Sequence, residues 1–173
     1  STVMWADPSN TFTLLASLLT AGYAVIGFVD DFLKVKRKSS GGLSGKLKLA
    51  FQFAIAIAVV MALYASDAIP EPIRYRLALP FLDFYEYEFV LHPAIYTAFS
   101  VIVIVGASNA VNLTDGLDGL AIGPVIISAG TFLFLTYAAG TLIAGFDIAR
   151  YLNIPSIRGV GELAIFCGAI TGA

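Results

Sequence analysis

The sequence has little cysteine, little histidine and little charge. Its 173 residues include one cysteine and one histidine, and only 13% of the side chains are charged. A lone Cys167 cannot form an intrachain disulfide, so a disulfide-stapled scaffold is excluded and we expect the thiol to pack as a small apolar group. The formal net charge of −2 gives no general attraction to nucleic acid, so an anionic partner would need a local cluster of Lys and Arg.

Apolar residues make up 58% of the chain, which is far above the usual share in a soluble domain and indicates an integral membrane protein. Several runs are long enough, at about 1.5 Å per residue, to cross a hydrocarbon layer of ~30 Å. The predicted spans are Thr11 to Val29, Leu47 to Ala65, Ala94 to Val111 and Leu120 to Ile143, and Leu163 to Ala173 begins a fifth, truncated helix. We therefore expect an all-α polytopic membrane protein with a single domain over residues 1–173, and the chain ends suggest a fragment.

The distribution of charge predicts how these spans are oriented. The loop between the first two spans holds six of the ten basic residues and should be cytoplasmic by the positive-inside rule. Residues 67 to 93 should then be external, and among their charged residues five are acidic and only two are basic. Within them, apolar and polar residues alternate over 75–79 and 85–91 around Pro80 to Asp83, which predicts a small external β-hairpin. His92 falls at this outer boundary, so we interpret it as structural.

Two acidic clusters interrupt the apolar sequence, and the predicted topology brings both to the cytoplasmic face. Asp30 and Asp31 end the first span, and Asp30 and Lys34 are four residues apart, hence on one helical face. A solvated helix end with an ordinary ion pair would explain this motif taken alone.

The second cluster carries more polar groups than a turn requires. Asn109 and Asn112 share a face of the third span, and Asp115 and Asp118 follow with Gly116 between them. Amides and carboxylates can accept hydrogen bonds from a base or a ribose and can ligate a hard cation, while glycine allows close approach of a ligand. The alternative is that these residues only cap and turn the chain between two helices.

Carboxylates mixed with ammonium groups suit a phosphate ester bound with magnesium. The metal would neutralise phosphate oxygens that Lys34 and Lys46 also contact. From the residues alone we infer phosphoryl transfer at the membrane surface with Mg²⁺ as the cofactor.

The same residues resemble a known family. The stretches VDDFLKV, GGLSGKLKLAFQ and NAVNLTDGLDGLAIGP are similar, in this order, to the bacterial phospho-N-acetylmuramoyl-pentapeptide-transferases, within the polyprenyl-phosphate N-acetylhexosamine-1-phosphate transferases. The resemblance implies transfer of phospho-MurNAc-pentapeptide from its UDP carrier to undecaprenyl phosphate, which yields lipid I and UMP for peptidoglycan synthesis. It also implies an enzyme of the bacterial inner membrane, active on the cytoplasmic side, with a possible homodimer.

The resemblance assigns roles by position. Asp30, Asp31 and Asp115 would be catalytic, with Asp30 the candidate base for the lipid phosphate. Substrate would be bound by Lys34, Lys46, Asn109, Asn112, Asp115, Gly116, Leu117 and Asp118. Asp31 and Asn112 are weaker candidates for the metal, because the family's main metal-binding Asp and its His-rich loop lie outside this chain.

Other functions and mechanisms stay open at this point. A related enzyme could transfer phospho-GlcNAc to the same lipid carrier, and the reaction could pass through a phospho-aspartyl intermediate instead of a direct attack. A transporter is the alternative from another class, but the proposed spans carry no carboxylate at mid-bilayer depth that could relay ions.

Overall fold

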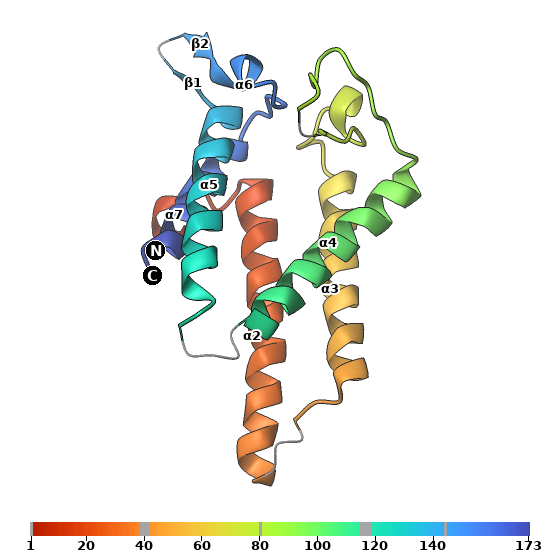
Figure 1. Cartoon of the computed structure of the whole chain (residues 1–173), viewed down its shortest axis with the longest axis vertical. Coiled ribbons are helices and arrows are strands. Elements are labelled where there is room, and N and C mark those ends of the chain that lie inside the picture. The colour runs from red at the N-terminus through yellow and green to blue at the C-terminus, as the bar shows by residue number, and fades with distance from the viewer. Residues whose placement is uncertain (1, 39–41, 80, 115–118, 144) are drawn as a thin grey trace.

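The computed structural model describes residues 2–38, 42–79, 81–114, 119–143 and 145–173. Four long apolar helices dominate it: α2 (Thr11–Arg37), α3 (Gly45–Ala65), α4 (Pro93–Thr114) and α5 (Ile122–Gly140). Each is long and apolar enough to cross a membrane, and consecutive helices run in opposite directions (Figure 1). The expected all-α membrane fold is confirmed.

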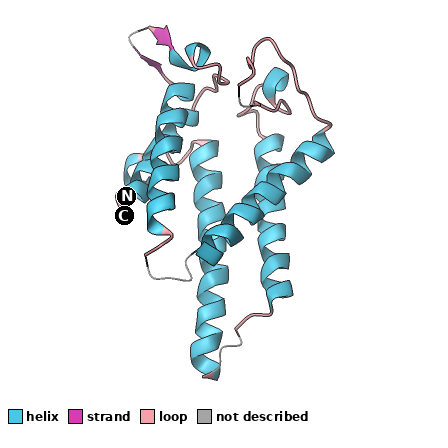
Figure 2. Ribbon diagram, in the orientation of Figure 1, coloured by secondary structure: helices cyan, strands magenta, loops and turns pink. Residues whose placement is uncertain are grey.

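Short elements fill the rest of the described chain. They are α1 (Thr2–Trp5), η1 (Glu71–Ile73), β1 (Leu142–Ile143), β2 (Phe146–Asp147), α6 (Ile148–Tyr151), η2 (Val160–Glu162) and α7 (Leu163–Thr171). The strands β1 and β2 pair antiparallel at one end of the molecule (Figure 2). α7 confirms the predicted fifth helix, and its nine residues are too few to span a bilayer.

The first three long helices pack in sequence order, whereas α5 packs on the C-terminal helix. α2 contacts α3, α3 contacts α4, and α5 packs on α7. The buried core between α3 and α4 consists of Ala56, Val60, Val101 and Val105. Large apolar side chains on the outer faces stay exposed, for example Phe28 at 70% and Ile127 at 72%, which fits helices that meet lipid.

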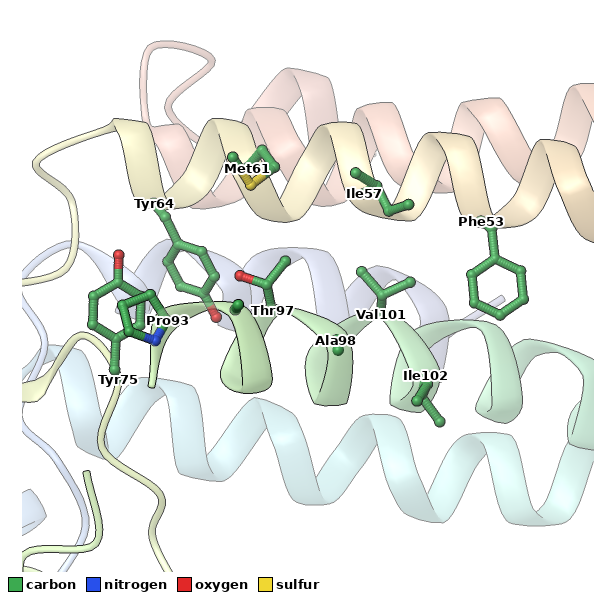
Figure 3. Close-up of a pocket in the computed structure, with 11 residues that line it drawn as sticks. Phe53, Ile57, Met61, Tyr64, Tyr75, Pro93, Thr97, Ala98, Val101 and Ile102 are labelled. Carbon is green, nitrogen blue, oxygen red and sulfur yellow. The ribbon is translucent and has the colours of Figure 1, made fainter. Parts of the chain in front are cut away.

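The two ends of the bundle differ in character, and we name them by their residues. The Asp30 end contains the C-terminal part of α2 and the start of α3, which reach the lowest part of Figure 1, and the last turns of α4, which end higher in that view. The tyrosine end contains Tyr64 of α3, Tyr75, and Tyr96 of α4, whose ring centroids lie 5.3 to 6.1 Å apart. An apolar cavity of about 640 Å³ runs between α3 and α4 from this cluster toward Phe53 (Figure 3).

Helix α2 is longer than the apolar run predicted. We expected a span ending at Val29, but the helix continues through Asp30 and Asp31 to Arg37. Its 27 residues extend about 40 Å, which exceeds a hydrocarbon layer of ~30 Å. Asn10 caps its start through hydrogen bonds from the Phe12 and Thr13 backbone N–H groups, and Lys38 in the left-handed region (φ 48°) ends it.

The predicted hairpin over 75–91 is reduced to one antiparallel bridge between Arg76 and Val90. The Leu77 N–H donates to the Phe89 carbonyl and the Leu91 N–H to the Tyr75 carbonyl. Strands do not extend further because the chain turns inside the loop, where the Tyr87 N–H donates to the Asp83 carbonyl. Pro80, part of the predicted turn, lies outside the described residues.

The fourth span ends earlier than predicted. Helix α5 stops at Gly140, and residues 142–143, which we expected to be helical, form strand β1. A Cβ at Gly140 would lie 2.6 Å from the Gly161 Cα, so the two backbones touch where the helix ends. The Gly161 contact and the left-handed Gly145 (φ 83°) favour a turn here over a longer helix.

Candidate active site

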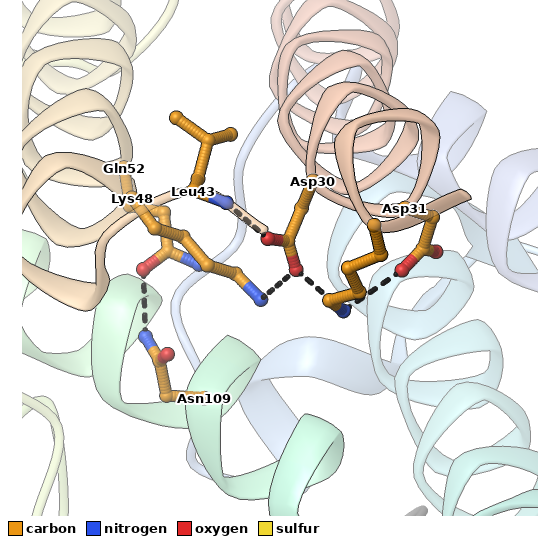
Figure 4. A network of polar contacts seen from close by, with 7 residues as sticks. Asp30, Asp31, Leu43, Lys48, Gln52 and Asn109 are labelled. Atoms are coloured by element: carbon orange, nitrogen blue, oxygen red, sulfur yellow. Dashed lines mark hydrogen bonds and ion pairs between the residues drawn. The ribbon is translucent and has the colours of Figure 1, made fainter. Parts of the chain in front are cut away.

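Asp30 is the centre of a polar network at the Asp30 end (Figure 4). The residue is 8% exposed, which is rare for a carboxylate without partners. Its Oδ2 lies 2.9 Å from the Lys34 Nζ and 3.9 Å from the Lys48 Nζ, and its Oδ1 accepts a hydrogen bond of 2.8 Å from the Leu43 backbone N–H. The predicted pairing of Asp30 with Lys34 on one face of α2 is confirmed, and both carboxylate oxygens are engaged.

Asp31 lies beside this network but faces solvent. Its side chain is 76% exposed, and its Oδ1 lies 3.0 Å from the same Lys34 Nζ. Lys34 is itself 41% exposed, so one ammonium group bridges an enclosed and an accessible carboxylate. A phosphate that approaches from solvent could therefore reach Lys34 and Asp31 without displacing protein backbone.

Gly42 allows the chain to pass over Asp30 between α2 and α3. A Cβ at this position would collide with the Asp30 carboxylate, and would lie 2.8 Å from the Asp30 carbonyl oxygen and 3.0 Å from the Lys34 Cε. Only glycine fits so close to the α2 backbone. The next residue, Leu43, then donates its N–H to Asp30, and Ser44 caps α3.

Lys48 is the cation that sequence reasoning did not assign to the site. It is partly buried and near Asp30, whereas Lys46, the predicted phosphate contact, is exposed on α3. Two residues along a helix turn by about 200°, so Lys46 and Lys48 point to different sides. A usable signal was the spacing of Lys48 and Gln52, which are four apart and form a polar stripe on an apolar helix.

The Asn109 side chain is hydrogen-bonded to α3. Its Nδ2 donates to the Gln52 Oε1 at 2.9 Å and to the Val105 carbonyl at 2.8 Å. Asn112, one turn further along α4, is exposed. Because Gln52 follows Lys48 by one turn of α3, the contacts bring Asp30 and Asn109 to the same end of the bundle. The predicted meeting of the first acidic cluster with the inner end of the third span is confirmed to this extent.

Four predicted site residues cannot be placed. Asp115, Gly116, Leu117 and Asp118 lie outside the described residues, and α4 ends at Thr114 immediately before them. Their assignment as catalytic and nucleotide-binding residues stays a prediction.

At the Asp30 end, Asp31 is the described carboxylate that a divalent cation could reach. Over the described ranges, no group of three or more His, Cys, Asp or Glu side chains could hold a metal. Both oxygens of Asp30 already have partners, but Asp31 is accessible and its oxygens are hard ligands of the kind that Mg²⁺ prefers. Asp31 therefore fits a magnesium ion as one ligand among others, and exposed Asn112 offers an amide oxygen.

His92 is found at the opposite end, as expected. Its Nδ1 accepts a hydrogen bond of 3.3 Å from the Ala94 backbone N–H, and its carbonyl accepts from the Ile95 and Tyr96 N–H groups. These contacts satisfy the first turn of α4 and confirm a structural position.

A bundle of membrane-spanning helices with a mixed carboxylate and ammonium network at one end defines an integral membrane protein with a polar surface site. Comparison with known proteins identifies its family. Residues 13–172 match Glycosyl transferase family 4, and the chain belongs to that family.

Curated relatives support the resemblance seen in the motifs. The chain is 54% identical to a phospho-N-acetylmuramoyl-pentapeptide-transferase of Sorangium cellulosum over 99% of this chain and 47% of that protein. It is 48% identical to the one of Syntrophus aciditrophicus over 100% of this chain and 45% of the relative, and 45% identical to that of Maricaulis maris over 99% and 46%. The chain spans about half the length of the curated relatives it matches.

Proposed function

We propose that the protein containing this chain transfers phospho-MurNAc-pentapeptide from UDP-MurNAc-pentapeptide to undecaprenyl phosphate, yielding lipid I and UMP. Family membership and the names of the relatives support the reaction class. The observation that carries the proposal is the pair of carboxylates, one enclosed and one accessible, that share Lys34 at the end of a membrane-spanning helix. The end of a membrane-spanning helix is a place that both a lipid-anchored phosphate and a water-soluble nucleotide can reach.

In the direct route, the Asp30 carboxylate accepts the proton of the lipid phosphate. An oxygen of that phosphate then attacks the β-phosphorus of the nucleotide, and the bond from this phosphorus to the bridging oxygen breaks. UMP leaves with the electron pair. Lys34 makes this possible by moving from Asp30 to the incoming phosphate, which frees the Asp30 Oδ2 to accept the proton. Charge neutralisation and positioning supply most of the rate enhancement.

Lys48 keeps part of the positive charge close to Asp30 during that exchange. Its Nζ lies 3.9 Å from the Asp30 Oδ2, and its side chain is 23% exposed. Lys46 lies nearby on the exposed face of α3 and contributes to attraction of the diphosphate from solution.

Magnesium is part of this proposal. Asp31 and Asn112 would contribute ligands, and Asp115 and Asp118 would complete the nucleotide pocket. When bound, the ion would neutralise the phosphate oxygens of the donor and of the departing UMP.

The orientation in the membrane follows from the loop of residues 34–48. Its six cations favour the cytoplasmic side of the bacterial inner membrane, where UDP-linked donors are made. A homodimer is a further expectation from the resemblance, and light scattering of the full-length protein in detergent would measure it.

The decisive experiment is a transfer assay with the full-length protein in nanodiscs. UDP-MurNAc-pentapeptide, undecaprenyl phosphate and Mg²⁺ should give UMP and lipid I in equal amounts, and EDTA should abolish both products. Turnover of UDP-GlcNAc with no turnover of the muramoyl donor would assign the chain to the related GlcNAc-1-phosphate transferases instead.

The same assay separates the direct and covalent routes. The direct route requires the lipid acceptor before any UMP appears. A burst of UMP in the absence of undecaprenyl phosphate, stoichiometric with enzyme, would favour a phospho-aspartyl intermediate.

A further inference from the structure

Gln52 joins three helices beside the Asp30 network, and Figure 4 shows its bond to Asn109. The residue is only 5% exposed although it lies on an apolar helix. Its side-chain Oε1 accepts from the Asn109 Nδ2 of α4 at 2.9 Å, and its backbone carbonyl accepts from the Tyr23 hydroxyl of α2 at 3.1 Å. A buried amide is costly to leave unpaired, so these contacts favour one rotation and one register of the three helices.

The position of this junction connects it to the site. On α3, Gln52 lies one turn after Lys48, whose ammonium group is near Asp30. On α4, Asn109 lies one turn before Asn112 and five residues before the end of the helix at Thr114. A slip of α4 by one turn would displace its end by about 5.4 Å relative to Lys48 and Asp30.

We propose that Gln52 is a positioning residue for the transfer reaction, acting through Asn109 to hold the end of α4 in register with the Lys48–Asp30 pair. In this proposal Asn109 serves the site through its bond to Gln52 and not by contact with the nucleotide. The inference rests on the proposed transferase function, and it adds a role for Gln52, the last residue of the GGLSGKLKLAFQ stretch, to which the resemblance assigned none.

The first test compares kinetics of full-length variants. Gln52→Leu and Asn109→Leu should each lower kcat on the order of tenfold to 100-fold, the range that a small misplacement of reacting groups produces. KM for the nucleotide should stay nearly constant, and the double variant should be no worse than either single one, because both remove the same bond. A rise in KM for Asn109→Leu without one for Gln52→Leu would overturn the inference.

A swap of the two side chains guards against simple misfolding. Gln52→Asn and Asn109→Gln each misplace the amide by one methylene, and the double swap restores the combined length. The double variant should recover most of the kcat lost by the singles. Additive losses would contradict a role that depends on this bond.

The matched control uses the same two helices at the other end. The Tyr64 hydroxyl of α3 and the Ser100 Oγ of α4 lie 3.2 Å apart at the tyrosine end. Tyr64→Phe removes that bond and should leave kcat unchanged, because it does not set the register at the Asp30 end. An equal loss in Tyr64→Phe would reduce the role of Gln52 to general helix packing and overturn the inference.

A measurement without turnover separates this inference from the proposed function. Spin labels attached at Leu49→Cys and Leu113→Cys, in a full-length background without other cysteines, report the distance between the Asp30 ends of α3 and α4. Gln52→Leu should broaden or shift the distance distribution, and Tyr64→Phe should not. An unchanged distance distribution in Gln52→Leu overturns the inference. An inactive wild-type protein overturns the proposed function, and the spin-label distances still test whether Gln52 holds the helix register.

Discussion

The two ends of the bundle both hold buried charge, but they leave different amounts of it within reach of a ligand. At the Asp30 end the enclosed carboxylate shares Lys34 with Asp31, and these partners are 41% and 76% exposed. At the tyrosine end the Arg76 side chain is 8% exposed, stacked 4.4 Å from the Phe84 ring centre and 3.3 Å from the Glu88 carboxylate. The Asp30 end leaves charged groups accessible to a ligand, whereas the Arg76 side chain is enclosed by contacts within the protein.

This difference indicates which charges serve chemistry and which serve folding. Arg76 also donates to the Phe84 carbonyl, and the Tyr96 hydroxyl donates to the Arg76 carbonyl, so the residue ties the loop to α4. Lys34 has no comparable enclosure, and its contacts can be exchanged for those of a substrate. Substitutions at the two ends should therefore separate activity from stability.

Asp31→Asn tests the accessible side of the comparison and should have the largest effect. We expect kcat for lipid I formation to fall by about 100-fold or more, because under the proposed function Asp31 would face the reacting phosphates and would lose its charge. The thermal unfolding temperature should hardly change, since the side chain is 76% exposed. Retention of near-normal kcat would break the assignment of Asp31 to the site.

Arg76→Leu tests the enclosed side. Loss of the guanidinium should destabilise the protein by about 2 to 3 kcal/mol, below the cost for a fully buried pair because Glu88 is 69% exposed. Denaturant unfolding of the full-length protein in detergent measures this, with Arg76→Lys as the variant that keeps the charge. The folded fraction should retain its kcat, and a specific loss of kcat would contradict a purely structural Arg76.

Gly42→Ala tests whether the backbone at Gly42 passes as close to Asp30 as the geometry indicates. The added methyl group would meet the Asp30 carboxylate and the α2 backbone, so we expect a destabilisation of about 1 to 2 kcal/mol together with a lower kcat. Gly27→Ala on α2 is the control, because a Cβ there would meet nothing within 4 Å. Equal effects of the two changes would argue against a specific role of Gly42.

Glu71→Gln should have the smallest effect on stability and activity of the four substitutions. The Glu71 Oε1 lies 2.8 Å from the Arg74 Nη1, but the acid is 80% exposed. Because Glu71 is exposed and the Arg74 guanidinium keeps its hydrogen bonds to the Ile69 carbonyl, the loss should be below about 0.5 kcal/mol, and thermal unfolding and activity should both stay close to wild type. A larger loss would show that the outer loop is more tightly coupled to the bundle than its contacts suggest.

Much of the fold was predictable because it depends on local sequence. Apolar runs of spanning length predicted the four long helices, and the spacing of Asp30 and Lys34 predicted their pairing on one face. The ends of elements were harder to place. Helix α2 continued past Val29 because charged residues are compatible with a helix that leaves the membrane, and α5 stopped at Gly140 because of a contact with Gly161, 21 positions away in sequence.

The sequence by itself determined the membrane class, the number and alternation of the spans, and the presence of Asp30, Asp31 and Lys34 on one helix. Only the tertiary structure decided that Lys48 and not Lys46 approaches Asp30, that Gln52 pairs with Asn109, and that Gly42 must lie against α2. The physical reason is that residue spacing sets relations within one helix. Contacts between helices depend on the rotation and register of each helix against its neighbour, which the packing and the hydrogen bonds between helices determine.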